Sequence, residues 1–151
     1  MNDIQKKHLK YLTHWCSRAE KSLYDIRQYL IKHSVPGDLH QDIFDYLIEH
    51  DYVNEQRYVA AFVHDAFKFN HWGRQKIRQA LLQKKINSEL ISQAIDSQID
   101  ADEYKAVLKD LLSRKKQSLK NEENKVQKQK SINFALSRGF ELEIILKVLE
   151  S

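Results

Sequence analysis

Apolar residues recur at helical spacing along the whole chain, and the same arrangement of two apolar stripes occurs three times. The arrangement begins at Ile26, Ile77 and Ser131, and each time a short turn separates the first stripe from the second. A further apolar stripe precedes each pair. Because a helical pattern that repeats about every fifty residues is typical of tandem arrays, the chain is predicted to be all-α, with three tandem three-helix repeats. We expect these repeats at residues 1–53, 54–99 and 100–151.

Several helix ends are marked by residues that can cap free backbone groups. Ser22 and Asn54 are expected to begin helices, because a short polar side chain accepts hydrogen bonds from the free amides of a first turn. Asp38 and Asp100 each precede a Gln or Glu by three residues and therefore resemble capping boxes. Gly139 is well placed to end a helix in the left-handed conformation.

Aromatic residues lie on the first stripe of each repeat. Five of them stand at core-facing positions: Tyr11, Trp15, Tyr58, Phe62 and Tyr104. This spacing favours packing inside the repeats, and a platform on which nucleic-acid bases stack is the alternative. Trp72 differs because it follows a break between two stripes. We expect it to fill the gap between two helices, with anchoring of a partner as the alternative.

Composition excludes several classes of protein. Apolar residues make up 42% of the 151 residues, which is too many for a disordered chain. Three glycines and one proline are too few for the turns of a β-protein. No apolar run approaches the roughly 18 residues of a membrane helix, and the N-terminus has no apolar secretory signal. The single cysteine, Cys16, excludes an internal disulfide, so we expect a cytoplasmic protein without membrane contact.

Positive charge is concentrated in the last third of the chain. The formal net charge is +4, but residues 105–130 alone carry 9 Lys and Arg against 3 Asp and Glu. Such a stretch can bind phosphate backbones or an acidic protein groove, and a solvated helix face is the alternative. Residues 113–130 are almost purely polar, so we expect the third repeat to contain a long, exposed basic helix or a partly frayed one.

Taken in order along the chain, several segments resemble the motifs of the RecX family. The central signature of that family is similar to residues 54–63, 72–77 and 81–86, the closing motif to residues 138–149, and the opening motif to residues 18–30. The resemblance covers nearly the whole chain. Two positions depart from the family pattern. Glu55 stands in place of an aspartate, and Lys85 in place of a glycine, which costs about 1 kcal/mol if that residue is left-handed.

The resemblance implies a fold and a function. Members of the RecX family are elongated, curved, right-handed helical arrays that bind the RecA recombinase. They lodge in the groove of its filament on single-stranded DNA and restrain its activity in recombination, DNA repair and the SOS response. By this resemblance we expect a cytoplasmic monomer that is a regulator, most simply an inhibitor, and not an enzyme. The alternative is a helical module that binds single- or double-stranded DNA directly, and a scaffold for an unrelated protein also stays open.

Basic side chains are the candidates for contact with the filament or with DNA. One cluster lies on the helix expected after Trp72, and another lies within the polar segment of the third repeat, residues 113–130. The candidates are Arg57, Trp72, Arg74, Lys76, Arg78, Lys84, Lys85, Arg114, Lys115, Lys116, Lys120, Lys125 and Lys128. The alternative for each is a solvated or dipole-pairing residue at a helix surface.

No motif predicts catalysis or a cofactor. The chain has seven histidines, but none has the paired spacing of a zinc site; His64 and His71, for example, lie seven residues apart. Cys16 falls on an apolar stripe, where it is expected to be a small core residue. Because no glycine-rich phosphate loop occurs either, we expect neither a metal nor a nucleotide cofactor.

Overall fold

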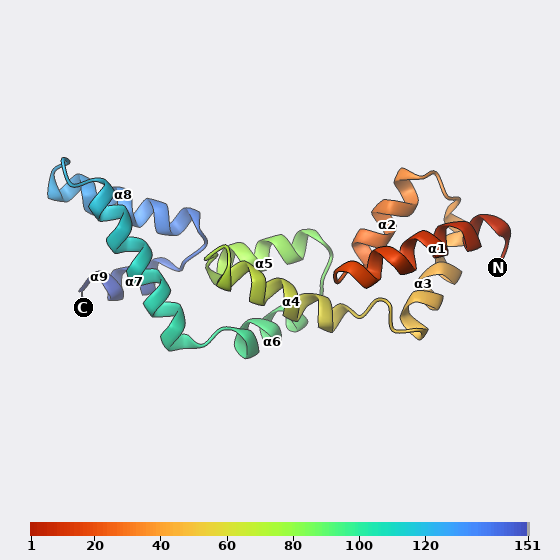
Figure 1. Cartoon of the computed structure of the whole chain (residues 1–151). Coiled ribbons are helices and arrows are strands. Elements are labelled where there is room, and N and C mark those ends of the chain that lie inside the picture. Colours follow the sequence, from red (N-terminus) through yellow and green to blue (C-terminus); the bar gives the residue numbers. More distant parts are fainter. Residues whose placement is uncertain (151) are drawn as a thin grey trace.

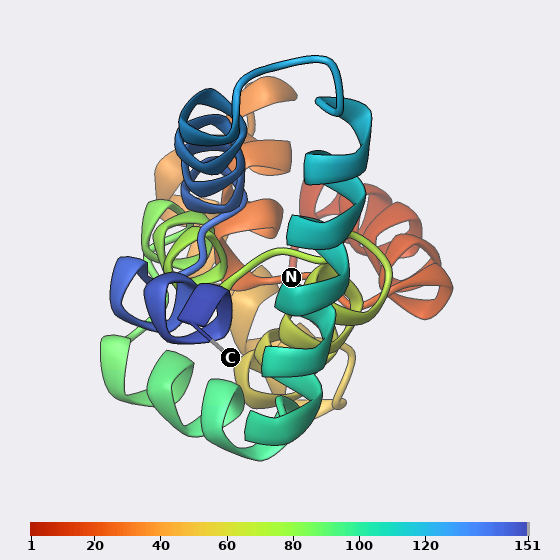
Figure 2. The same cartoon turned by 90° about the vertical axis from the view of Figure 1, so that its left-hand side faces the viewer.

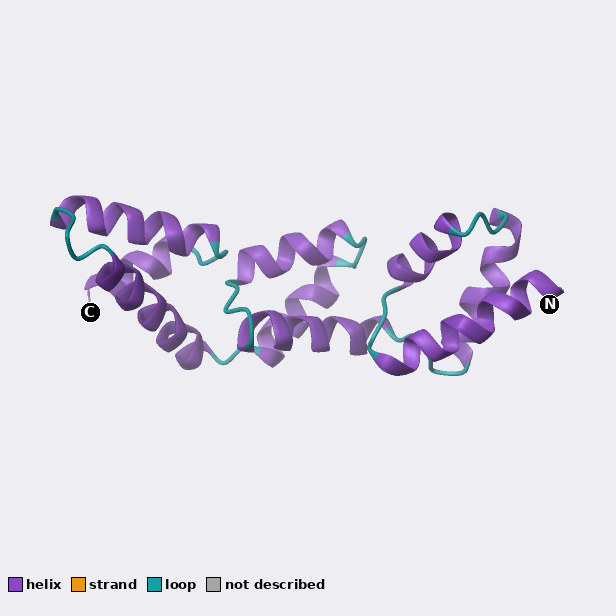
Figure 3. Cartoon of the chain, turned by 45° about the horizontal axis from the view of Figure 1, so that its top comes forward, coloured by secondary structure: helices purple, strands orange, loops and turns teal. Residues whose placement is uncertain are grey.

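The computed structural model describes residues 1–150, which form an elongated array of helices without strands (Figures 1 and 3). The first predicted repeat contains α1 (Asp3–Arg18), α2 (Leu23–Lys32) and α3 (His40–Glu49), the last preceded by a 3-10 turn (Gly37–Leu39). The second contains α4 (Glu55–Lys68), α5 (Arg74–Gln83) and α6 (Ser88–Gln98), and the third α7 (Ala101–Ser118), α8 (Asn124–Ser137) and α9 (Leu142–Glu150). The predicted all-α class and the three-helix repeats are confirmed.

The two ends of the chain lie at opposite ends of the array (Figure 1). Figure 2 looks along the array from the C-terminal end, so that the third repeat stands in front of the other two. The first repeat has a hydrophobic cluster of its own, from Leu9 to Val53. The second and third repeats share one cluster, which runs from Tyr58 to Ile145. Helices α4 to α9 therefore form one packed body, to which the first repeat is attached.

Side-chain caps begin most of the helices where the sequence predicts them. Ser22 accepts from the N–H of Asp25 in a reciprocal capping box, and Asn54 accepts from the N–H of Arg57 at 2.9 Å. Asp100 caps α7. The predicted capping box at Asp38 is wrong, because the 3-10 turn that contains this residue runs directly into α3 and leaves no open first turn to cap.

The turn between the second and third helix is built in the same way in every repeat. The second residue beyond the end of α2, α5 and α8 takes the left-handed conformation. These residues are Ser34, Lys85 and Gly139. The buried residue that follows it donates its N–H to the carbonyl five positions earlier, at 3.0 Å for Val35, 3.2 Å for Ile86 and 3.1 Å for Phe140. This geometry closes a helix end and buries an apolar side chain against it. Lys85, which departs from the family glycine, therefore does lie at a left-handed position, with φ of 61°.

The expected long basic helix of the third repeat is not continuous. Helix α7 ends at Ser118 and α8 begins at Asn124, so the basic residues are divided between two packed helices. Gln127 is buried, and its Nε2 donates to the carbonyl oxygens of Leu119 at 2.8 Å and Glu122 at 2.9 Å. These bonds hold the turn closed. A polar run without an apolar stripe does not reveal a buried glutamine of this kind.

Two glycines bring the second and third repeats into backbone contact. The N–H of Gly73 donates to the carbonyl of Arg138 at 2.7 Å, and the N–H of Gln75 donates to the carbonyl of Gly139 at 3.0 Å. A Cβ on Gly73 would overlap the carbonyl group of Gly139 and the amide of Phe140. A side chain is therefore excluded at Gly73 by the neighbouring repeat.

We expect Gly73→Ala to lower the free energy of unfolding by about 3 kcal/mol, because the added methyl group must push the two repeats apart. Gly37→Ala is the matched control, since no atom lies within 4 Å of its added Cβ, and it should change stability by less than about 0.5 kcal/mol. Urea denaturation followed by circular dichroism measures both. Equal stability of the two variants would contradict the close contact.

Candidate partner-binding surface

Arg57, one of the predicted binding residues, holds the first repeat against the second. Its Nε donates to Glu20 at 2.6 Å, its Nη1 to the carboxylate of Asp51 at 3.1 Å and its Nη2 to the carbonyl of Asp51 at 3.0 Å. Glu55, which replaces the family aspartate, accepts from the N–H of Leu23 at 2.8 Å. The start of α4 is thus bonded to three residues of the first repeat, namely Glu20, Leu23 and Asp51.

Lys84 forms a second link between these repeats. Its ammonium group lies 2.8 Å from Asp25 and 5.4 Å from the ring centroid of Tyr58. Burial raises the pKa of the Asp25 carboxyl, but the hydrogen bonds from Lys84 and Ser22 outweigh this and hold the pKa below its ordinary value. The carboxylate is therefore charged at neutral pH, and the ion pair with Lys84 is formed.

Arg74 and Tyr104 connect the second repeat to the third. The guanidinium of Arg74 stacks 3.9 Å over the ring of Tyr104 and donates to Glu141 at 3.0 Å. The Tyr104 hydroxyl donates to the same carboxylate and accepts from the N–H of Arg74 at 3.0 Å. Burial raises the pKa of Tyr104 far above its ordinary value, and the carboxylate of Glu141 raises it further. The hydroxyl therefore remains protonated and holds the junction together.

Of the other predicted binding residues in the second repeat, some contact side chains of the same repeat and one is exposed to solvent. Arg78 donates to Ser92 at 2.9 Å. The ammonium of Lys76 lies 4.5 Å from the centroid of the Trp72 ring, and that ring packs edge-on against Phe62. Trp72 is partly buried against the shared core, as the gap-filling interpretation predicts. Lys85 is exposed.

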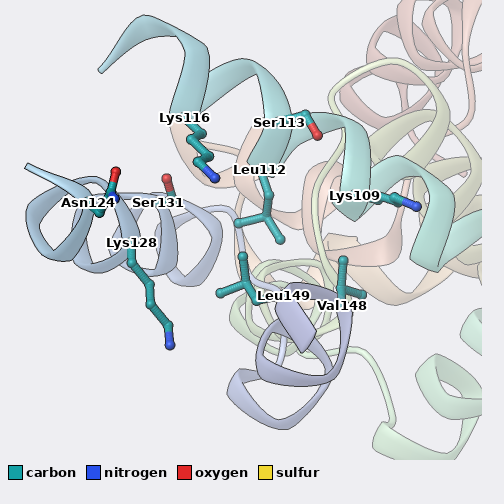
Figure 4. Close-up of a pocket in the computed structure, with 9 residues that line it drawn as sticks. All are labelled: Lys109, Leu112, Ser113, Lys116, Asn124, Lys128, Ser131, Val148 and Leu149. Atoms are coloured by element: carbon teal, nitrogen blue, oxygen red, sulfur yellow. The ribbon is translucent and has the colours of Figure 1, made fainter. Parts of the chain in front are cut away.

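In the third repeat the predicted basic residues lie on two helices and the turn between them. Arg114 pairs with Asp110 at 3.0 Å, and Lys115 lies 5.0 Å from the centroid of the Phe134 ring. Lys116 and Lys128 line a groove between α7, α8 and α9 (Figure 4). Lys120 and Lys125 are exposed, and no carboxylate of residues 1–150 pairs with either of them. Contact of all these residues with a partner stays a prediction.

An exposed aromatic stack in the first repeat is a feature that the sequence pattern did not reveal. Tyr58 and Tyr104 are buried as predicted, but the core position predicted for Tyr11 is wrong, because half of this side chain is exposed. Its ring stacks on Tyr29 of α2, with centroids 5.1 Å apart. The rings of Tyr29 and Trp15 also pack together, with their centroids 6.1 Å apart. Tyr11 and Trp15 lie four residues apart on α1 and stack on each other, whereas only the packing of α1 against α2 adds Tyr29, for which spacing along the chain gave no signal.

Chemical groups for catalysis or metal binding do not converge in the described part of the chain. Within residues 1–150 no three His, Cys, Asp or Glu side chains are grouped so that they could hold a metal ion. Burial raises the pKa of the Cys16 thiol to about 11, so this residue is a protonated, half-buried packing group at neutral pH. None of the helices of residues 1–150 has both the length and the apolar character needed to cross a membrane.

We expect Tyr104→Phe to lower the free energy of unfolding by about 2 kcal/mol, because it leaves the partly buried Arg74 amide and a Glu141 oxygen without their partner. Tyr24→Phe is the control, since the hydroxyl of Tyr24 makes no hydrogen bond within residues 1–150, and it should cost less than about 0.5 kcal/mol. Chemical denaturation of both variants measures the difference. Equal losses would contradict the role of the junction.

Acidification should weaken the link between Lys84 and Asp25. Because the folded-state pKa of Asp25 is lowered, its contribution is complete above the ordinary value of 3.8 and is lost as the pH falls through the lower folded value. Asp25→Asn should therefore reduce stability at neutral pH and remove part of its acid dependence, as measured by urea titrations at decreasing pH. The exposed control Asp38→Asn should retain the full dependence, and a parallel loss in both variants would refute the assignment.

Comparison with known proteins agrees with this repeat architecture. A family model for the second three-helix domain of RecX matches residues 54–95, and one for the third three-helix domain matches residues 102–149. A protein of Streptococcus uberis named regulatory protein RecX is 32% identical over 135 residues, which are 87% of this chain and 48% of that protein. A protein of Bacillus pumilus with the same name is 27% identical over 98% of this chain and 56% of its own length. The chain spans about half the length of the curated relatives it matches.

Solved structures show the same fold. The crystal structure of a regulatory protein RecX has a TM-score of 0.90 at 21% identity, over 99% of this chain and 74% of that one. RecX from Lactobacillus salivarius has a TM-score of 0.86 at 17% identity, over 99% of this chain and 97% of that one. Because the two family models together match more than half of the chain, and proteins of the same name align with most of it, this chain belongs to the RecX family.

Proposed function

We propose that this chain regulates a RecA-type recombinase by binding in the groove of its filament on single-stranded DNA. The observation that carries the proposal is the match of two RecX domain models in tandem, together with relatives that are named regulatory proteins. The expected effect is restraint of recombination and of the SOS response by a non-enzymatic, cytoplasmic monomer. No cofactor takes part in this mechanism.

The shape of the array supports binding along an extended groove. Helices α4 to α9 share one core, and Arg57 and Lys84 link the first repeat to them through ion pairs. Modest contacts made by each repeat then act together, because binding through one repeat raises the effective concentration of the others. To restrain the recombinase, the array must bind one filament state more tightly than another.

The basic residues that remain unpaired are the best candidates for contact with the filament. Arg57, Arg74 and Lys84 already form ion pairs that join the repeats, so their charge is largely used inside the molecule. Lys85, Lys120 and Lys125 are exposed. The proposed contact surface therefore includes these three lysines, while the arginines at the joints set the arrangement of the repeats that present them.

Direct binding to nucleic acid is the second candidate function. The observation in its favour is the stack of Tyr11 on Tyr29, of which Tyr11 is half exposed. Unpaired bases stack on aromatic side chains of this kind, and lysines beside them neutralise phosphates. The ammonium of Lys21 lies 4.8 Å from the centroid of the neighbouring Trp15 ring.

We expect the purified chain to bind RecA filaments on single-stranded DNA tightly at near-physiological salt, and naked DNA only weakly at low salt. Groove binding depends on many protein contacts, whereas binding to phosphates alone weakens steeply with salt. Fluorescence anisotropy of the labelled chain, with filament and with the same DNA alone, measures both. Equal binding to naked DNA that disappears as salt rises would replace the proposal with the nucleic-acid module.

A charge variant separates the contact surface from the joints. Lys85, Lys120 and Lys125 changed together to Glu should weaken filament binding at least about tenfold without a change in unfolding free energy. The matched control changes Lys7, Lys10 and Lys32 to Glu, which alters the net charge equally on the first repeat. Equal weakening by both sets would show that only net charge matters.

A further inference from the structure

A groove in the third repeat has no assigned role. It lies between α7, α8 and α9 and encloses about 500 Å³. Figure 4 shows its side chains, which come from all three helices. Those that carry the argument are Lys109, Leu112, Lys116, Lys128, Ser131 and Leu149. The volume is within the range of about 300–1,000 Å³ that is typical of ligand sites in proteins.

The rim of the groove is positively charged, and none of its lining side chains within residues 1–150 is a carboxylate. Lys109, Lys116 and Lys128 are all exposed, and within residues 1–150 none of them pairs with an acidic side chain. Of the carboxylates close in sequence to the lining residues, Asp110 pairs with Arg114 at 3.0 Å and Glu122 with Lys130 at 2.7 Å. Glu123 and Glu150 are exposed and pair with no lysine of the groove within residues 1–150. Within residues 1–150 the groove therefore presents three lysines that form no ion pair.

A buried hydroxyl in the wall of the groove has no partner. Ser131 is only 2% exposed, and its Oγ makes no hydrogen bond within the described residues. A buried polar group without a partner is rare, because desolvation without a hydrogen bond is unfavourable. Because the Oγ is closed to solvent in this conformation, a ligand acceptor oxygen supplies the missing partner once the Ser131 side chain turns toward the groove.

The floor of the groove is apolar and aliphatic. Leu112 from α7 and Leu149 from α9 point toward one another, with Val148 beside them (Figure 4). No aromatic residue lines the groove, so it offers no surface on which a nucleic-acid base would stack. The lysines Lys109 and Lys116 stand two helical turns apart, about 10 Å, which is the length of about three extended residues.

We propose that this groove binds an acidic amphipathic segment of a partner protein. An aliphatic side chain of the segment packs on Leu112 and Leu149, and carboxylates on either side of it pair with Lys109, Lys116 and Lys128. The Ser131 hydroxyl donates a hydrogen bond to one of these carboxylates. The assignment does not require the partner to be a recombinase, because it follows from the charge, the hydroxyl and the apolar floor of the groove itself.

The test uses the full chain and a short fluorescein-labelled peptide of glutamates around one central leucine, followed by anisotropy. We expect saturable binding that weakens about tenfold when Lys109, Lys116 and Lys128 are changed together to Gln. The control changes Lys7, Lys10 and Lys32 to Gln, which removes equal charge from the first repeat, and should leave binding unchanged. Equal weakening in both variants, or no binding by the unaltered chain, would overturn the proposal.

Two further probes test the floor and the hydroxyl. A peptide with serine in place of leucine should bind several-fold more weakly, and a short oligothymidylate should not compete at near-physiological salt. Ser131→Ala should weaken peptide binding by about threefold without lowering the unfolding midpoint, since it removes a buried hydroxyl that has no partner in the free chain. Unchanged binding by Ser131→Ala, or oligothymidylate that displaces the peptide, would contradict an acidic protein segment as the occupant. No recombinase is present in this assay, so its outcome is independent of the proposed regulation.

Discussion

The backbone contact between Gly73 and Gly139 is the constraint on which the rest of the array depends. Gly73 and the first turn of α5 can donate hydrogen bonds to the end of α8 and the loop after it only because neither Gly73 nor Gly139 carries a side chain. This approach places Tyr104 beneath Arg74 and within reach of Glu141. The aromatic ring of Tyr104 then packs on Phe140 and Phe67, with ring centroids 4.9 and 5.8 Å apart, and the two repeats acquire a common core.

The two joints of the array differ in their physical character. The second and third repeats are joined by a buried hydrophobic cluster and by backbone hydrogen bonds, whose contribution changes little with salt. The first repeat is attached largely through the ion pairs of Arg57 and Lys84, which lie closer to solvent. Partly exposed ion pairs are screened by salt and contribute modestly. The link between the first and second repeats is therefore more sensitive to salt than the link between the second and third.

The distribution of charge has two separate roles in this molecule. Arg57, Arg74 and Lys84 belong to the basic residues counted in the sequence, yet each of them holds two repeats together. The lysines of the third repeat around α7 and α8 are less compensated and face a groove with an apolar floor. A count of basic residues treats both sets alike. The difference arises because a carboxylate from another repeat lies within reach of one set and not of the other.

The sequence by itself determined the helices, their order and the family. Apolar spacing is a local property, and so are the caps at Ser22, Asn54 and Asp100, because each depends on residues within one or two helical turns. Only the tertiary structure decided which basic residues are paired, that Tyr11 and Tyr29 form a partly exposed stack, and that the basic segment is divided between two helices whose turn is closed by Gln127. These features depend on side chains that are distant along the chain or on burial created by packing. The pattern of residues along the chain does not give contacts between distant residues or the burial that packing creates. Both are determined by how the helices pack together.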